Sequence, residues 1–101
     1  MATIGQFAAI LEADQRHEYR KQYPRTPDAV IDRACAVHVT RARRYTRVDV
    51  GDSGKYMVVN ETGEIYGIKG YGVIHPGHQY GTLDTVGHFY WGGYLARPVD
   101  V

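Results

Sequence analysis

The chain is poor in the residues that staple small proteins or perform nucleophilic chemistry: among its 101 residues it has one cysteine and one serine. The lone Cys35 excludes an internal disulfide and fits a reducing compartment. The opening stretch MATIGQFAAILEAD has no basic leader, and its apolar run is too short for a signal or membrane-spanning helix. A cytoplasmic location without membrane contact is therefore the expectation.

The chain also lacks the short motifs that announce common enzymes. It contains no G-x-S-x-G elbow, no P-loop and no dinucleotide fingerprint. Ser53 falls in a turn-like segment, and Cys35 falls on an apolar helical stripe where a buried packing role is expected. We therefore predict a protein that is not an enzyme, with no cofactor, no catalytic residues and no metal.

Overall charge is close to balanced, at +1 with 44% apolar and 23% charged residues. These values are typical of an ordinary globular domain. Residues 1–50 carry nine Arg and Lys against six acids, whereas residues 51–101 carry three against five. Whole-molecule charge therefore favours neither nucleic acid nor membrane, and any basic surface is expected in the first half.

The first helix has clear start and stop signals. Thr3 and Gln6 have capping-box spacing, with Thr at the N-cap and Gln three residues later. Apolar residues then recur at helical spacing. This pattern predicts a helix from about Ile4 to Tyr19–Gln22, ended by Pro24.

A second helix is expected to start with Thr26 as its cap and Pro27 at the first helical position. If it persists to residue 47, Arg33, Arg41, Arg44 and Arg47 gather on one side of it. The opposite side then carries Ile31, Ala34, Cys35, His38, Ala42 and Tyr45. Thr46–Val50 is alternatively a first strand, which leaves the end of this helix open.

A β-hairpin is predicted around the turn Asn60–Gly63, which has Asn at its first position and Gly where φ must be positive. Placing Asn60 opposite Glu64 pairs Val59 with Ile65. Side chains alternate between faces along a strand. The face expected to join the core then holds Tyr56, Val58, Tyr66 and Ile68, and the other face holds Met57, Val59 and Ile65.

Beyond the hairpin, the sequence predicts a short strand over Tyr71–Ile74 and a type II turn with Pro76-Gly77 at its centre. His88–Leu95 reads as a strand with a bend at Gly92-Gly93. Its inner face is expected to hold Phe89, Trp91 and Leu95, and its outer face His88, Tyr90 and Tyr94.

Together these elements predict an α+β fold, with two N-terminal helices packed on a three- to five-stranded, mostly antiparallel sheet. Residues 1–101 are expected to form a single domain, with a helical half at 1–47 and a β half at 48–101. The chain is long enough for one hydrophobic core.

Aromatic residues are the most informative surface feature. The chain has nine tyrosines, and tyrosine is enriched at protein–protein interfaces. An outward row of phenols and imidazoles in the second half predicts a protein-binding surface, the alternative being that half of these tyrosines pack in the core. The predicted partner-binding residues are Tyr71, His75, His78, Tyr80, His88, Tyr90 and Tyr94.

Two other functions remain open from the residues alone. The segment from Arg41 to Arg47 is the most basic in the chain, so nucleic-acid binding through Arg41, Arg43, Arg44 and Arg47 competes with a simply solvated helical face. The weaker alternative is a metal-dependent hydrolase centred on His75, His78 and His88, since imidazoles at the corners of a turn are metal ligands in other proteins.

One stretch carries a resemblance. The run GIKGYGVIHPGHQYGTLD (Gly67–Asp84), with TGEIY before it and YWGGY after it, resembles the C-terminal part of small uncharacterised proteins of bacteriophages and related mobile elements. The resemblance covers Lys55–Tyr94 and brings no established activity, so no functional residue is carried over. It implies a non-enzymatic accessory protein in the host cytoplasm that occupies a surface of a host or defence protein, as anti-CRISPR and other anti-defence inhibitors do.

Overall fold

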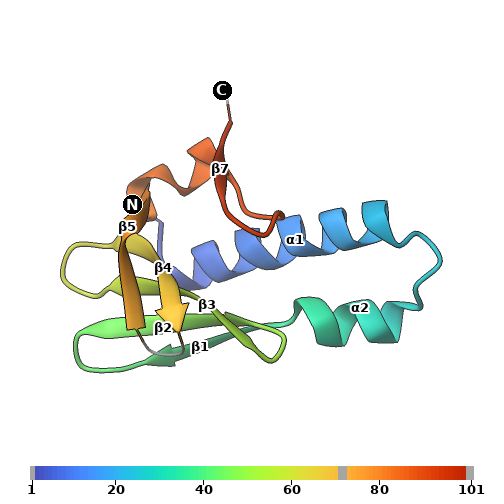
Figure 1. The fold of residues 1–101 in the computed structure, drawn as a ribbon, viewed down its shortest axis with the longest axis horizontal. Coiled ribbons are helices and arrows are strands. Elements are labelled where there is room, and N and C mark those ends of the chain that lie inside the picture. Colours follow the sequence, from blue (N-terminus) through green and yellow to red (C-terminus); the bar gives the residue numbers. More distant parts are fainter. Residues whose placement is uncertain (1, 71–72, 100–101) are drawn as a thin grey trace.

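The computed structural model describes residues 2–70 and 73–99. Two N-terminal helices are followed by a five-stranded antiparallel sheet of order β1-β2-β3-β4-β5, which confirms the predicted α+β fold. Figure 1 shows α1 beside the sheet, α2 next to α1 beyond the end of the sheet, and the C-terminal segment close to α1. The elements are α1 (Ile4–Gln22), α2 (Asp28–Cys35), β1 (Val37–Arg41), β2 (Tyr45–Val50), β3 (Ser53–Val59), β4 (Glu64–Gly70), β5 (Val73–Thr82), the 3₁₀ helix η1 (Leu83–His88), β6 (Phe89–Tyr90) and β7 (Arg97–Pro98).

Helix α1 begins and ends where its sequence signals place it. The Thr3 hydroxyl accepts a hydrogen bond from the Gln6 backbone N–H at 3.1 Å, and the Gln6 side chain accepts one from the Thr3 N–H at 2.9 Å. This capping box satisfies N–H groups that have no partner within the helix. Phe7 and Leu11, one turn apart, are fully buried against the sheet.

The second helix does not persist to residue 47, because α2 ends at Cys35; the alternative, a strand over Thr46–Val50, is confirmed by β2. The N-cap of α2 is Pro27, one residue later than predicted. Val37 instead starts an edge strand: it pairs with Val50, and its N–H donates to the Glu12 carboxylate at 3.1 Å. The β half therefore begins at residue 37, and His38 and the basic segment lie on a hairpin instead of a helix.

The β3–β4 hairpin forms around the predicted turn, with Gly63 at a φ of 76°, but its register differs from the prediction by one residue. Val58 pairs with Ile65, and Gly63 N–H donates to Val59 C=O at 2.8 Å. A one-residue slip moves every side chain of a strand to the other face. Ile65 is therefore in the core, and Tyr66 is on the opposite face beside Met57.

Strand β5 continues through Pro76-Gly77, so the predicted type II turn does not end the strand. Ile74 pairs with Ile68 and Gln79 pairs with Tyr66, which leaves residues 75–78 opposite Gly67 alone. This is an enlarged bulge on the edge strand. It pushes the histidine segment out of the regular ladder, which explains why Pro76 is tolerated there.

The predicted strand His88–Leu95 is reduced to β6, because residues 83–88 form the 3₁₀ helix η1 and β6 pairs only with β7. Trp91 nevertheless points inward as expected, with 0% exposure. Its indole packs edge-on against Phe7 at 4.8 Å and Tyr56 at 5.3 Å between ring centroids. Leu95 was expected on the same inner face but is 50% exposed, since the chain bends at Gly92-Gly93.

Candidate functional site

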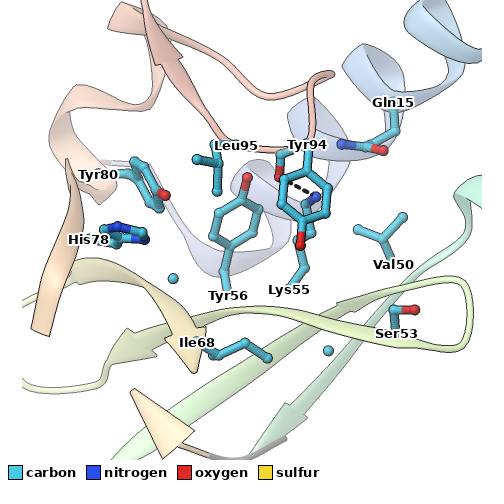
Figure 2. A pocket seen from close by; sticks show the side chains of 12 residues that line it. Gln15, Val50, Ser53, Lys55, Tyr56, Ile68, His78, Tyr80, Tyr94 and Leu95 are labelled. Carbon is cyan, nitrogen blue, oxygen red and sulfur yellow. Dashed lines mark hydrogen bonds between the residues drawn. The ribbon is translucent and has the colours of Figure 1, made fainter. Parts of the chain in front are cut away.

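One concave site lies between the sheet and the chain segment that follows Trp91. It encloses about 400 Å³, which is within the range of small-ligand pockets. Figure 2 shows side chains entering it from the sheet, from α1 and from the Tyr94–Leu95 segment. We call it the aromatic pocket; its lining residues are Gln15, Val50, Ser53, Gly54, Lys55, Tyr56, Gly67, Ile68, His78, Tyr80, Tyr94 and Leu95.

Hydrogen bonds from α1 hold this C-terminal segment in place. The Gln15 amide donates to Trp91 C=O at 2.6 Å, and Trp91 N–H donates to the Asp14 carboxylate at 3.0 Å. A Cβ on Gly92 would lie 2.5 Å from Asp14 C=O, so only glycine permits this close approach. The segment that covers the pocket, residues 91–95, is thus attached to α1, more than 70 residues away in sequence.

Lys55 supplies the one cationic group in the pocket lining. Its ammonium donates to Tyr94 C=O at 2.6 Å and lies 4.9 Å from the centre of the Tyr94 ring (Figure 2). Partial burial lowers the pKa of Lys55, because desolvation disfavours the charged form. An ammonium has three donor hydrogens, so two of them are left for other groups.

Tyr56 and Tyr80 form the inner aromatic wall. Their rings meet edge-to-face at 5.7 Å, and they are 2% and 9% exposed. The Tyr56 hydroxyl is buried and makes no hydrogen bond of good geometry. The backbone N–H of Ala96 lies close enough to favour the ionised form of this phenol. Burial raises the pKa of both phenols, and most strongly that of Tyr56.

The two histidines of the bulge form one unit beside this wall. The rings of His75 and His78 stack in parallel, 3.9 Å apart, and His78 lies 6.4 Å from the Tyr80 ring. The Nδ1 atom of His75 is buried and has no partner. Within residues 2–70 and 73–99, no group of three or more His, Cys, Asp or Glu side chains is placed to hold a metal ion. The predicted trio of His75, His78 and His88 is therefore not assembled.

The structure brings together three of the seven predicted partner-binding residues, since His78, Tyr80 and Tyr94 line the aromatic pocket. Tyr94 is 89% exposed. His75 adjoins the pocket through its stack on His78. His88 is exposed at the end of η1, and Tyr71 falls outside the described residues.

Tyr90 does not belong to this group, because its side chain packs against α1. Its hydroxyl donates to the Glu18 carboxylate at 2.9 Å, and Arg97 covers its ring at 4.9 Å. Burial, together with the hydrogen bond to Glu18, raises the pKa of Tyr90 to about 12. The same hydrogen bond lowers the pKa of Glu18. Tyr90 therefore attaches the C-terminal segment to the helix.

The predicted basic residues meet at the tip of the β1–β2 hairpin. Arg41, Arg43 and Arg44 surround a second hollow, of about 610 Å³, with Tyr45, Val59, Asn60 and Glu61. We call this the arginine tip. Arg47 lies apart from it in β2, opposite Met57, and is partly buried.

Asn60 locks the backbone of the arginine tip. Its side-chain amide donates to Ala42 C=O at 2.9 Å and Arg43 C=O at 3.3 Å, and its N–H donates to Arg44 C=O at 3.0 Å. Its side-chain oxygen accepts from the buried Thr46 hydroxyl at 2.6 Å. The tip thus presents exposed guanidinium groups on a fixed backbone.

Sequence reasoning missed Lys55, Tyr56 and Gln15 as site residues. Tyr56 was expected only to join the core, and no role was predicted for Lys55 or Gln15. The double glycine Gly92-Gly93 was the available signal, because it allows the chain to turn back over the sheet. The identity of the residues underneath depends on the tertiary fold.

Comparisons add no named relative: no protein-family model, curated protein or solved structure matches this chain. In the described part of the chain, none of the helices has the length and apolar character needed to cross a membrane.

Proposed function

We propose that this chain is a small non-enzymatic binding protein of the phage or mobile-element kind, acting in the host cytoplasm by occupying a surface of a host or defence protein. The observation that carries this proposal is the position of Tyr94. Its side chain is 89% exposed at the pocket, and its backbone C=O accepts a hydrogen bond from the Lys55 ammonium. A large exposed aromatic on a fixed backbone is the usual form of an interface anchor, because little conformational entropy is lost on binding.

The neighbourhood of Tyr94 supports the same function. Leu95 is 50% exposed next to it, and His78 is exposed across the pocket. Apolar and aromatic groups gathered at a concave site, with a lysine at the centre, fit a partner that inserts a side chain or a chain end. An anti-defence inhibitor, including one directed at a CRISPR effector, works in this way, by covering a surface its target needs.

The test is capture of a partner from a host lysate with the tagged chain, comparing Tyr94→Ala with Tyr23→Ala. Tyr23 is also an exposed tyrosine, at 55%, but follows α1 outside the pocket. We expect a specific partner to be captured by the unchanged protein and by Tyr23→Ala, and lost with Tyr94→Ala. Equal capture by both variants would remove Tyr94 from the interface.

Nucleic-acid binding through the arginine tip is the second candidate, and the locked backbone around Asn60 is what favours it. Arg41, Arg43 and Arg44 are exposed, and pre-positioned guanidinium groups suit phosphate contacts. Three such contacts give a salt dependence of log K against log[salt] with a slope of about −3 on duplex DNA. If the unchanged protein does not shift DNA or RNA in a gel at low salt, this function is excluded. If it does, and the double variant Arg43→Gln with Arg44→Gln does not, the function is supported.

A further inference from the structure

The buried hydroxyl of Tyr56 is the starting point. A buried polar group without a partner costs free energy, about 1–3 kcal/mol in typical cases. Tyr56 is only 2% exposed, and Figure 2 shows its hydroxyl directed toward the Tyr94–Leu95 segment, between the side chains of those two residues. Phenylalanine would fill the same core position without this cost, so the hydroxyl needs another explanation, and a ligand at the pocket provides one.

Charge in the pocket has one sign. Lys55 is its one ammonium, and none of the 12 lining residues is acidic. The ammonium donates to the neutral Tyr94 C=O, and within residues 2–70 and 73–99 no carboxylate forms an ion pair with it. A half-buried cation without a counter-ion favours a ligand that brings one negative charge.

The rest of the lining is suited to an apolar body. Tyr80, His78 and Leu95 surround one side of the space, and Val50 and Ile68 lie on the other (Figure 2). Aromatic and aliphatic walls with a few convergent polar groups are the usual build of a small-ligand site. A volume of about 400 Å³ has room for a ring or a branched chain with a small polar head.

We propose that the aromatic pocket binds an apolar group carrying one carboxylate, with the carboxylate on the Lys55 ammonium and the Tyr56 hydroxyl and the apolar body against Tyr80, His78 and Leu95. The hydroxyl has no accessible surface beside the exposed Leu95, so the carboxylate reaches it when the Leu95 side chain changes rotamer; the hydroxyl then donates to the carboxylate, which gives Tyr56 its missing partner. This goes beyond the proposed function, since the ligand is either a small carboxylic acid or the carboxyl terminus of a protein chain that ends in an apolar residue.

A carboxylate fits better than the other small ions. A cation is repelled by Lys55. A phosphate carries nearly two negative charges and is usually held by several cations or backbone N–H groups, whereas this lining has one lysine. The lowered pKa of Lys55 agrees with this assignment, because an incoming carboxylate would favour the charged form that burial disfavours.

The experiment is a titration followed by ¹H–¹⁵N NMR on the whole chain. Benzoate is compared with benzamide, its uncharged isostere, and with inorganic phosphate. A hexapeptide ending in phenylalanine is added in two forms, with a free carboxylate and with an amidated end. We expect saturable shifts at Lys55, Tyr56 and Tyr94 with benzoate and at least tenfold weaker binding of benzamide and phosphate. The tighter of benzoate and the free-acid peptide identifies the source of the carboxylate.

Variants assign the binding to named groups. Lys55→Met and Tyr56→Phe keep the size and apolar stem of each side chain, and each is expected to weaken benzoate at least tenfold, as loss of a hydrogen bond to a charged group does. Lys69→Met, an exposed lysine of β4 outside the pocket lining, is the matched control and should leave binding unchanged. Their NMR spectra confirm that each variant is folded.

The proposal is overturned if benzamide or phosphate binds as tightly as benzoate, if no ligand produces saturable shifts, or if folded Lys55→Met binds benzoate normally. This outcome is independent of the lysate experiment. Benzoate binding without any captured partner removes the proposed protein partner and keeps the carboxylate site, whereas Tyr94-dependent capture without carboxylate binding does the reverse.

Discussion

The aromatic pocket and the arginine tip both carry positive charge, but the charge is partly buried in the pocket and exposed at the tip. At the tip, three exposed arginines within four residues of sequence stand on a backbone locked by Asn60. In the pocket, one half-buried lysine is surrounded by aromatic rings brought from β3, β5 and the C-terminal segment. An exposed charge interacts weakly with a ligand because water and salt screen it. A desolvated charge interacts strongly and therefore discriminates between ligands.

The comparison also separates local from long-range stabilisation. The tip depends on contacts between residues 42–46 and Asn60. The segment that covers the aromatic pocket depends on the burial of Trp91 in the core and on hydrogen bonds to Asp14 and Gln15. Each region can therefore be weakened through residues that take no part in the other.

The largest loss of stability is expected from Trp91→Ala, next to the aromatic pocket. Trp91 has 0% exposure and contacts Phe7, Tyr56 and Tyr80, so its removal leaves a large cavity. We expect a loss of about 3–5 kcal/mol in the free energy of unfolding, measured by urea denaturation. Tyr94→Ala, three residues later but 89% exposed, is the control and should change it by less than about 0.5 kcal/mol.

At the arginine tip, Asn60→Ala is expected to cost about 2–3 kcal/mol. It removes hydrogen bonds to Ala42 and Arg43 and leaves the buried Thr46 hydroxyl without its partner. Urea denaturation measures the loss, and Glu61→Ala, the exposed neighbour, should be close to neutral. If Asn60→Ala matched Glu61→Ala, the tip backbone would not be locked as described.

Alkaline pH should destabilise the fold through its buried phenols. The pKa values of Tyr56, Tyr80 and Tyr90 are raised, that of Tyr90 to about 12, so the folded protein keeps these phenols protonated when the unfolded chain has begun to ionise. The sign follows from linkage: this stabilisation is complete below the unfolded tyrosine pKa of about 10 and is lost as pH rises through the folded value.

The measurement is the urea midpoint as a function of pH between pH 9 and 12. The midpoint should fall above pH 10, and Tyr90→Phe should make the fall less steep by removing one of these groups. An identical pH dependence in Tyr90→Phe and the unchanged protein would show that the contact with Glu18 does not hold the phenol in its neutral form.

The smallest effect on stability, with a large effect on binding, is expected from Lys55→Met. Burial lowers the pKa of Lys55, so its charge is held at a cost that the hydrogen bond to Tyr94 only partly offsets. We expect a free energy of unfolding equal to or slightly above that of the unchanged protein, within about 1 kcal/mol, measured by thermal denaturation followed by circular dichroism. A loss of several kcal/mol would make Lys55 a structural residue.

Patterns confined to one element were predictable. The capping box at Thr3 and Gln6 and the stop at Pro24 located α1, and Gly63 located the β3–β4 turn, because each depends on backbone geometry within a few residues. The α+β class followed from the order of these elements. The inward position of Trp91 followed from the alternation of faces along the expected strand His88–Leu95.

The errors arose where long-range pairing outweighed local preference. Arg41 and Arg44 fit a helical stripe, but Val37 pairs with Val50, so Arg41 ends an edge strand and Arg44 lies in the turn that follows it. The β3–β4 register slipped by one residue because a four-residue turn and a three-residue turn are both compatible with Asn60–Gly63. The Pro76-Gly77 pair signals a turn, yet an edge strand accommodates it as a bulge.

The sequence by itself determined which residues are available: one half rich in arginine, another rich in tyrosine and histidine, and helix and turn signals that set the α+β class. Only the tertiary structure decided which of them meet. Lys55, Tyr56, His78 and Tyr94 share a pocket, whereas Tyr90 is committed to α1. The physical reason is that Trp91 gains most by entering the core between α1 and the sheet, and its burial carries the following residues over Lys55.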